Sequence, residues 1–260
     1  MDDWPRRFFV DKSEMFLIRM NAMWKFAEED ARGIANIIKK YMPNGIRVLD
    51  LMCGNGRIAI HLAKLGFNVV GLDFSERFIA DAREKARVFG VEKNVEFVVG
   101  DARRVDEYFG EEFDAVLIFW SSIGYYDEDT DKEIFRRVYK ITRPGGLFMI
   151  LNTVSLELYA SYYRKNVVEF FGEDIFIDIN EFDVETATLR AKWRWYRRDG
   201  ENLKFMDEIE LRLRIYAKHE IVRMFREAGW EVVDMLHSHK TLEKARINSP
   251  INIVARKRVE

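Results

Sequence analysis

Apolar residues near the start of the chain recur at helical spacing before the pattern changes. Between Ser13 and Tyr41 they return every three or four positions, which predicts an amphipathic helix. The sequence Met42-Pro43-Asn44-Gly45 then interrupts this periodicity. Residues 1–44 are therefore expected to form a helical N-terminal extension.

Short apolar runs alternate with helical patterns between residues 45 and 152. The runs are nearly continuous, as expected for strands that are covered on both faces. Strands that alternate with helices predict a parallel, doubly wound sheet. The predicted strands are 46–51, 67–72, 95–99, 113–119 and 147–151, and the predicted helices are 57–65, 76–89 and 131–140.

The pattern changes again after residue 152. Apolar and polar residues alternate over 187–195 and again over 203–216, with the turn sequence Asp199-Gly200 between them. This predicts an antiparallel β insertion, with one buried face, within residues 153–216. Residues 217–260 return to a helix and two strands that complete the main sheet.

Composition and charge exclude several classes of protein. The 260 residues contain 42 Lys and Arg against 44 Asp and Glu, so no global basic footprint for nucleic acid is present. A single cysteine, Cys53, excludes an intramolecular disulfide and a cysteine-based zinc site. No signal peptide or membrane span is visible, so a cytoplasmic protein is expected. The absence of glutamine beside many Lys, Arg and Glu residues is typical of thermophile proteins.

The first strand–turn–helix segment, VLDLMCGNGR at residues 48–57, is the strongest candidate for a ligand-binding site. The strand contains Asp50, and Gly54-Asn55-Gly56 follows it before the helix. Glycines let a backbone approach a ligand, and ligands bind at the carboxyl ends of parallel strands. A dinucleotide site would need a third glycine, where the chain has Ile58-Ala59, and Asp50 would repel a phosphate. A positively charged ligand without a phosphate fits better.

This segment resembles the first motif of class I methyltransferases that use S-adenosylmethionine. Similar family segments follow in the same order at 67–75, 95–105, 113–126, 142–152, 225–236 and 249–257. The resemblance implies an α/β fold with a doubly wound, mostly parallel seven-stranded sheet, whose last strand is antiparallel. It also implies S-adenosylmethionine as cofactor and S-adenosylhomocysteine as product. The chain departs from the family at Met52, where a glycine is usual.

The resemblance also assigns cofactor-binding roles. It implies that Asp73 accepts hydrogen bonds from the ribose hydroxyls and that Asp101 meets the adenine amino group. The ring of Trp120 is expected near the sulfonium, where a cation–π contact is worth about 0.5–2 kcal/mol. The complete set of expected cofactor-binding residues is Asp50, Met52, Gly54, Asn55, Gly56, Asp73, Phe74, Ser75, Gly100, Asp101, Ala102, Phe119 and Trp120.

Other side chains are weaker candidates for chemistry. Tyr125, Tyr126 and His237 are candidate catalytic residues, with core packing as the alternative for the tyrosines. No metal site is expected, because His237 and His239 lack a third ligand. We interpret Arg57 as a surface or capping side chain. The basic run over 190–198 is interpreted as the solvated face of a hairpin, opposite Glu208 and Glu210.

We expect one methyltransferase domain that acts on an unidentified small-molecule acceptor. In this reading residues 1–44 are a lid, 45–152 the cofactor-binding core, 153–216 a roof over the substrate, and 217–260 the end of the sheet. No membrane or nucleic-acid partner is expected, and the insertion could pair two subunits. An RNA or protein methyltransferase and a non-catalytic cofactor-binding module remain alternatives, because a fold does not prove turnover.

Overall fold

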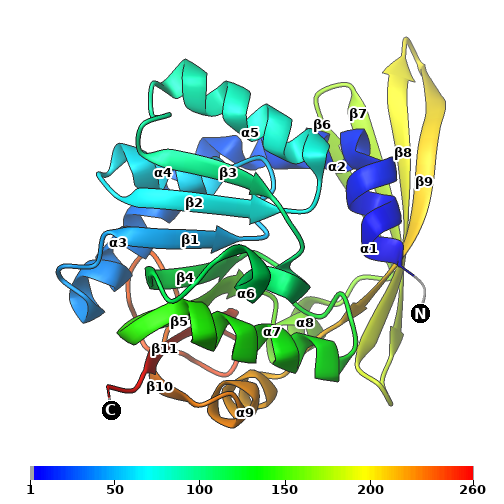
Figure 1. Ribbon diagram of the computed structural model, residues 1–260. Coiled ribbons are helices and arrows are strands. Elements are labelled where there is room, and N and C mark those ends of the chain that lie inside the picture. The colour runs from blue at the N-terminus through cyan, green and yellow to red at the C-terminus, as the bar shows by residue number, and fades with distance from the viewer. Residues whose placement is uncertain (1–2, 260) are drawn as a thin grey trace.

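A seven-stranded sheet lies at the centre of the computed structural model, which describes residues 3–259 (Figure 1). Its strand order is β10-β11-β5-β4-β1-β2-β3, and β11 runs antiparallel to both of its neighbours. The predicted doubly wound sheet with an antiparallel last strand is therefore confirmed. The strands are β1 (Arg47–Leu51), β2 (Asn68–Asp73), β3 (Val95–Val99), β4 (Phe113–Phe119), β5 (Thr142–Thr153), β10 (Trp230–Met235) and β11 (Ile251–Lys257).

Helices cover both faces of this sheet, which explains why its strands are nearly continuous apolar runs. On one face lie α3 (Ala27–Tyr41), α4 (Arg57–Lys64) and α5 (Glu76–Phe89). On the other face lie α6 (Val105–Tyr108) and α7 (Glu128–Ile141), together with α9 (Lys218–Glu227). Successive strand residues feed opposite cores, as at Val116 and Leu117 of β4, which are both fully buried.

The N-terminal segment is not the single helix that the sequence predicts over Ser13–Tyr41. It comprises α1 (Trp4–Arg6), a π-helical turn η1 (Arg7–Asp11), α2 (Ser13–Ala22), a 3₁₀ turn η2 (Met23–Phe26) and then α3. The prediction is wrong because the two helices pack against different partners. Met15 and Met20 of α2 join a cluster against the insertion, whereas Ile34 and Ile37 of α3 join the core of the main sheet.

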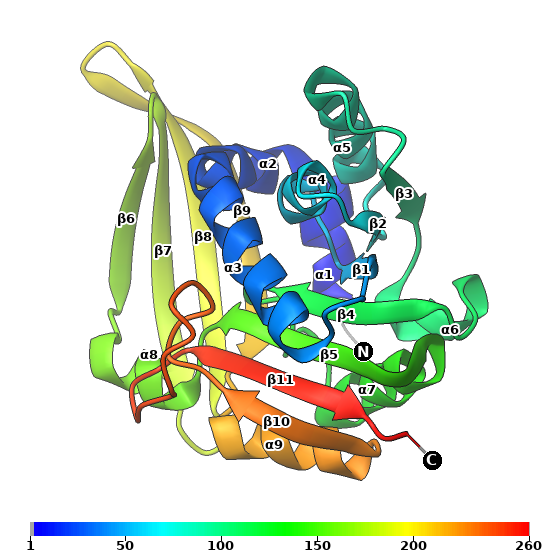
Figure 2. The same cartoon turned by 90° about the vertical axis from the view of Figure 1, so that its left-hand side faces the viewer.

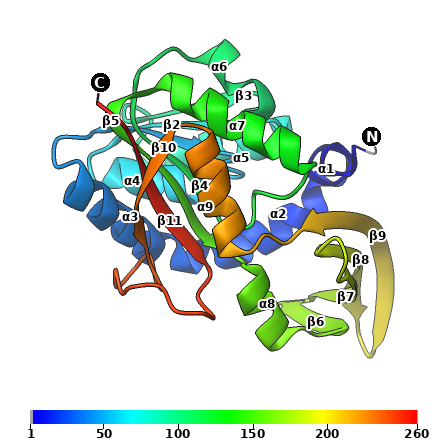
Figure 3. The ribbon, with the colours of Figure 1, turned by 90° about the horizontal axis from the view of Figure 1, so that it is seen from below.

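The insertion forms a second, antiparallel sheet of order β6-β7-β8-β9 that stands beside the main one (Figures 2 and 3). Its elements are α8 (Leu156–Tyr162), β6 (Asn166–Phe171), β7 (Asp174–Asp183), β8 (Thr188–Asp199) and β9 (Asn202–Arg214). The sequence predicts the β8–β9 hairpin, but β6 and β7 were not expected. A third apolar cluster fills the space between this sheet and the N-terminal helices; it includes Trp4, Phe8, Phe9, Phe176, Ala191 and Leu211.

The outer face of the insertion carries the predicted cross-strand ion pairs. Lys192 Nζ lies 2.8 Å from Glu210 Oε1, and Arg194 Nε lies 3.1 Å from Glu208 Oε2. Acidic side chains therefore offset much of the basic run on β8. The interpretation of this run as a solvated hairpin face is confirmed.

The edge strand β6 leaves two large apolar side chains in solvent. Val168 is 50% exposed and Phe170 is 64% exposed. Pairing of two subunits through the insertion stays a prediction that this edge permits. Within residues 3–259, no helix combines the length and the apolar character that crossing a bilayer requires.

Candidate active site

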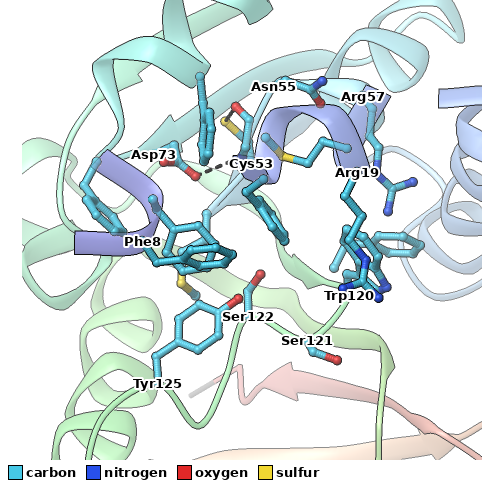
Figure 4. A pocket seen from close by; sticks show the side chains of 18 of the residues that line it. Phe8, Arg19, Cys53, Asn55, Arg57, Asp73, Trp120, Ser121, Ser122 and Tyr125 are labelled. Atoms are coloured by element: carbon cyan, nitrogen blue, oxygen red, sulfur yellow. Dashed lines mark hydrogen bonds between the residues drawn. The ribbon is translucent and has the colours of Figure 1, made fainter. Parts of the chain in front are cut away.

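A cavity of about 230 Å³ lies where β1, β2 and β4 end, beneath the N-terminal helices and the insertion (Figure 4). Its walls come from three separate stretches of the chain. They comprise Trp4, Phe8, Phe9, Phe16, Arg19 and Met20 from the N-terminal helices; Asp50, Met52, Cys53, Gly54, Asn55, Arg57, Ile58, Asp73, Phe74, Phe78, Phe119, Trp120, Ser121, Ser122 and Tyr125 from the core; and Trp193, Leu211 and Leu213 from the insertion.

Asp50 places an unsatisfied carboxyl group in the wall of this cavity. The residue is 2% exposed, and its Oδ2 has no hydrogen-bond partner within residues 3–259. Burial raises the pKa of Asp50 to about 7, opposed by the Arg57 charge and a backbone hydrogen bond from Ala59, and reinforced by Asp73. A buried polar atom without a partner is costly, so this carboxyl group is suited to a cationic or hydrogen-bond-donating ligand.

The loop after β1 adopts backbone conformations that favour glycine. Met52 has φ +60° and Gly54 has φ +55°. This conformation explains why the family usually has glycine at position 52, because a left-handed conformation costs other residues about 1–2 kcal/mol. A Cβ on Gly54 would lie 2.7 Å from the Sδ of Met20, so glycine also gives α2 room to approach. Beside it, buried Asn55 leaves its Oδ1 without a partner in the described chain.

Asp73 ties together the loops that follow β1 and β2. Its Oδ2 accepts a hydrogen bond from Gly54 N and its Oδ1 accepts one from Ser75 N, each 2.9 Å long. Burial raises the pKa of Asp73 to about 6, although both hydrogen bonds oppose the rise. Each carboxylate oxygen has a further lone pair for a ligand hydroxyl.

Trp120 is held in a strained conformation at the end of β4. Its φ is +71°, its N–H donates to Leu151 O at 2.9 Å, and its carbonyl accepts from the Thr153 hydroxyl. The Arg57 guanidinium lies 5.2 Å from the Trp120 ring centroid and 5.1 Å from that of Phe119. Strain that surrounding contacts enforce in this way is typical of functional sites.

Arg57 is not the surface side chain that the sequence suggests. It is 5% exposed, and its Nη1 lies 3.3 Å from Asp30 Oδ2 on α3. Asp30 also contacts His239 Nε2 at 3.1 Å. The interpretation is wrong because α3 covers the beginning of α4 and supplies a buried counter-ion, which the local sequence does not reveal.

The N-terminal segment contacts both the core and the insertion around the cavity. Trp4 Nε1 donates to the carbonyl of Tyr125 at 3.2 Å, and the two rings meet edge to face at 5.3 Å. The Phe8 ring meets Trp193 of the insertion at 5.2 Å. Such aromatic pairs add about 0.5–1.5 kcal/mol each to the energy of burial, so this segment and the insertion form one roof.

The structure brings together nine of the residues that the sequence proposes for the site, namely Asp50, Met52, Gly54, Asn55, Asp73, Phe74, Phe119, Trp120 and Tyr125. The following do not line the cavity: Gly56, Ser75, Gly100, Asp101, Ala102, Tyr126 and His237.

Several of these excluded residues have structural partners instead. The Asp101 carboxylate binds the Arg103 guanidinium, with 2.6 Å between Oδ2 and Nη2, and Arg103 also lies over the Tyr126 ring. His237 Nδ1 lies 2.8 Å from Ser249 Oγ. Residues 3–259 contain no group of three or more potential metal-ligating side chains.

The sequence did not reveal several of the residues that line the cavity. Arg19, Phe16 and Trp193 line the cavity, as do Ser121 and Ser122. Trp193 lies on the predicted apolar side of its strand, which was a usable signal for burial but not for a site. Arg19 had no signal, because a lone arginine in a helical pattern is usually solvated.

Known proteins match the core of the chain. A family model described as a methyltransferase domain matches residues 48–146. YqeM of Bacillus subtilis (strain 168), which is named as a methyltransferase, is 31% identical over 145 residues, or 55% of this chain and 53% of YqeM. The demethylmenaquinone methyltransferase of Lactococcus lactis subsp. lactis (strain IL1403) is 25% identical over 83% of this chain and 78% of its own length. The chain thus spans about half the length of YqeM and 78% of the length of the Lactococcus protein.

Solved structures match nearly the whole chain at low identity. A methyltransferase from Clostridium acetobutylicum ATCC 824 that depends on S-adenosylmethionine has a TM-score of 0.75, with 19% identity over 89% of this chain and 92% of its own. CalS10, an amino pentose methyltransferase from Micromonospora echinaspora, has a TM-score of 0.71, with 18% identity over 94% of this chain and 96% of its own. Residues 48–146 therefore belong to the methyltransferase domain family, and the chain has the class I fold of methyltransferases that depend on S-adenosylmethionine.

Proposed function

We propose that this protein transfers a methyl group from S-adenosylmethionine to a small-molecule acceptor. The observation that carries the proposal is the single cavity described above, which joins two chemically different ends. Unsatisfied buried polar atoms of Asp50 and Asn55 lie at the end formed by the core, and aromatic rings of the roof lie at the other. A donor and an acceptor could meet there away from water.

The core end of the cavity has the groups that S-adenosylmethionine needs. Asp50 would hold the ammonium group of the cofactor, and Asp73 would accept hydrogen bonds from the ribose hydroxyls. The turn around Gly54 leaves room for a close approach, and Phe74 and Met52 would flank the bound molecule. Cofactor binding remains a prediction for the residues that do not line the cavity, namely Gly56, Ser75, Gly100, Ala102 and Asp101 with its adenine contact. The cofactor, when bound, supplies an electrophilic methyl group on a sulfonium.

The roof residues would orient the acceptor and exclude water. None of the lining residues within 3–259 is Lys, His or Glu, and both lining aspartates belong to the core end. Burial raises the pKa of Tyr125, so its hydroxyl stays protonated at neutral pH. We therefore assign catalysis to positioning, with an acceptor that supplies its own lone pair, and Tyr125 as a positioning group. Tyr126 and His237 stay weaker candidates.

A small-molecule acceptor is favoured over RNA or protein. The cavity is enclosed by a roof, and the basic run on β8 is offset by Glu208 and Glu210 on the next strand. Two relatives are named demethylmenaquinone methyltransferase and ubiquinone biosynthesis O-methyltransferase, and one structural neighbour is named an amino pentose methyltransferase. These names support an acceptor of metabolite size.

Calorimetric titration of the purified protein with S-adenosylmethionine tests the proposal, with NAD as the control ligand. Binding of S-adenosylmethionine but not NAD is expected. Binding of neither ligand would contradict the proposal and would mean that Met52 closes the site or that the domain is a degenerate scaffold. Binding without methyl transfer to any acceptor in a metabolite screen would favour the non-catalytic module.

Deleting residues 1–10 is expected to lower turnover at least tenfold while the protein stays folded. The deletion removes Trp4, Phe8 and Phe9 from the roof but leaves the two cores of the main sheet intact. Turnover and the thermal unfolding midpoint are measured together, with Tyr162→Ala as a control at a residue that is 44% exposed and outside the cavity. Equal turnover of the shortened and complete proteins would refute the lid role.

A further inference from the structure

Arg19 is the cationic side chain that the roof presents to the cavity. It lies on α2, and its guanidinium carbon is 4.6 Å from the ring centroid of Trp193 on β8. Its side chain is only 19% exposed. Figure 4 shows Arg19 beside Trp120, on the far side of the cavity from Asp73. A group on the acceptor can therefore reach Arg19 while the cofactor occupies the core end.

Two carboxyl groups of the insertion surround the other side of Arg19. Glu169 Oε2 lies 2.8 Å from Arg19 Nη2. Asp178 is 7% exposed and interacts electrostatically with both Arg19 and Glu169. Val167 pairs with Asp178, and Asp178 pairs with Trp193, so Glu169, Asp178 and Trp193 share the sheet face that is turned toward α2.

These carboxyl groups compensate the charge of Arg19 without using up its hydrogen-bonding capacity. Glu169 Oε2 and Asp178 Oδ1 accept no hydrogen bond from any residue within 3–259, so the contact between Arg19 and Glu169 is an ion pair with poor hydrogen-bond geometry. A guanidinium has five N–H donors in a rigid fork. Arg19 can therefore donate to a ligand oxygen although its net charge is already balanced.

The walls around Arg19 are mostly apolar and aromatic, and Ser121 and Ser122 are the nearby polar lining residues. The rings of Phe16, Trp120 and Trp193 and the side chains of Leu211 and Leu213 line this end of the cavity. A strongly hydrated or highly charged acceptor would lose water here without enough compensating partners. An anion would also meet the two carboxyl groups behind Arg19. The site therefore favours an uncharged molecule with a flat apolar body and an oxygen at one edge.

We propose that Arg19 recognises the methyl acceptor by donating hydrogen bonds to an oxygen of an uncharged, flat, largely apolar molecule of the phenol or quinol class. This inference rests on the proposed methyltransferase function and specifies its substrate class. Glu169 and Asp178 are positioning residues that hold the guanidinium and exclude anionic acceptors.

The test measures binding of three naphthalene probes to the protein saturated with S-adenosylhomocysteine. Naphthol is uncharged at neutral pH, naphthoate is an anion and naphthylmethylammonium is a cation, and all three share one flat body. Calorimetric titration of the wild-type protein is expected to show the order naphthol tighter than naphthoate or the ammonium by at least tenfold. Absence of naphthol binding, or tighter binding of either ion, would overturn the proposal.

Variants then assign the preference to the named side chains. Arg19→Met is expected to weaken naphthol binding at least tenfold while the affinity for S-adenosylhomocysteine changes less than twofold. Asp178→Asn is expected to strengthen naphthoate binding at least fivefold, because it removes a repelling carboxylate. Arg190→Met is the matched control, since Arg190 is exposed on the same insertion and does not line the cavity.

The outcomes separate the two proposals. If the wild-type protein binds neither S-adenosylmethionine nor S-adenosylhomocysteine, the methyltransferase function itself fails. If it binds the cofactor but Arg19→Met binds naphthol as tightly as wild type, only the role of Arg19 fails. If Arg19→Met does not fold, Arg19→Lys replaces it in the test. This variant keeps the charge but loses the planar fork, and it is expected to bind naphthol at least threefold more weakly than the wild type.

Discussion

Replacing Asp50 with asparagine is expected to stabilise the unliganded protein by about 2–4 kcal/mol above pH 7 and to weaken binding of S-adenosylmethionine at least tenfold. The pKa of Asp50 is raised from 3.8 to about 7, chiefly by burial. That rise corresponds to at most about 4 kcal/mol. Asparagine avoids the cost of a buried charge but no longer attracts a cation.

The sign of the pH dependence follows from the same pKa. Between about pH 4 and pH 7 the folded protein binds more protons at Asp50 than the unfolded chain, so wild-type stability falls as pH rises through this range. The gain from Asp50→Asn is therefore small near pH 4 and complete above pH 7. Binding of S-adenosylmethionine to the wild type should strengthen over the same range, because the ionised carboxylate is the form that binds a cation.

Urea unfolding at pH 5 and pH 8, with calorimetric titration at both values, measures these effects. Asp199→Asn is the control, since Asp199 is exposed on the β8–β9 hairpin and should change neither stability nor binding. A variant with unchanged stability at pH 8 would show that Asp50 is solvated in the unliganded protein. Unchanged affinity would remove Asp50 from the cofactor site.

Asp73→Ala is expected to weaken binding of S-adenosylmethionine by tenfold or more and to change the free energy of unfolding little, because relief of the buried charge offsets the lost hydrogen bonds. The carboxylate accepts hydrogen bonds from Gly54 N and Ser75 N, so its loss leaves two loop amides without an acceptor and removes the proposed ribose contact. The protein should remain folded, because the apolar cores are untouched.

Asp73→Asn separates the two roles. Its amide oxygen can still accept one loop hydrogen bond and it buries no charge, so above pH 7 it should be at least as stable as the wild type but should not recover the affinity. Both variants are compared by urea unfolding and by calorimetric titration. A folded Asp73→Ala protein with wild-type affinity would disprove the ribose assignment.

The strand pattern was sufficient to predict the main sheet, because inner strands such as β1 and β4 are buried between two layers of helices and have no exposed polar face. The insertion was harder to predict. Phe176 of β7 is buried against the third cluster, while Val168 and Phe170 of β6 face solvent, so apolar residues occur on both sides of these strands. Alternation of apolar and polar residues cannot identify the buried face of an edge strand that is also apolar on its exposed face.

The core end of the cavity was predictable because its polar residues lie within a few positions of strand ends. Asp50 and Asp73 follow from this rule alone. The roof end of the cavity was not predictable, since Arg19 and Trp193 become neighbours only through the packing of α2 on the insertion. Asp101 also follows a strand end, but Arg103 binds its carboxylate outside the cavity, so its adenine contact stays a prediction.

Under the proposed function, donor recognition belongs mainly to the core of the chain and acceptor recognition mainly to the roof that closes the cavity. The core supplies lining residues from positions 50–78 and 119–125, whereas the roof comes from positions 4–20 and 193–213. Substitutions in the roof can therefore change which molecule is methylated while leaving the methyl donor the same. An ancestral core of this kind could acquire new substrates by exchanging two short segments, so related chains with nearly identical cores need not share an acceptor.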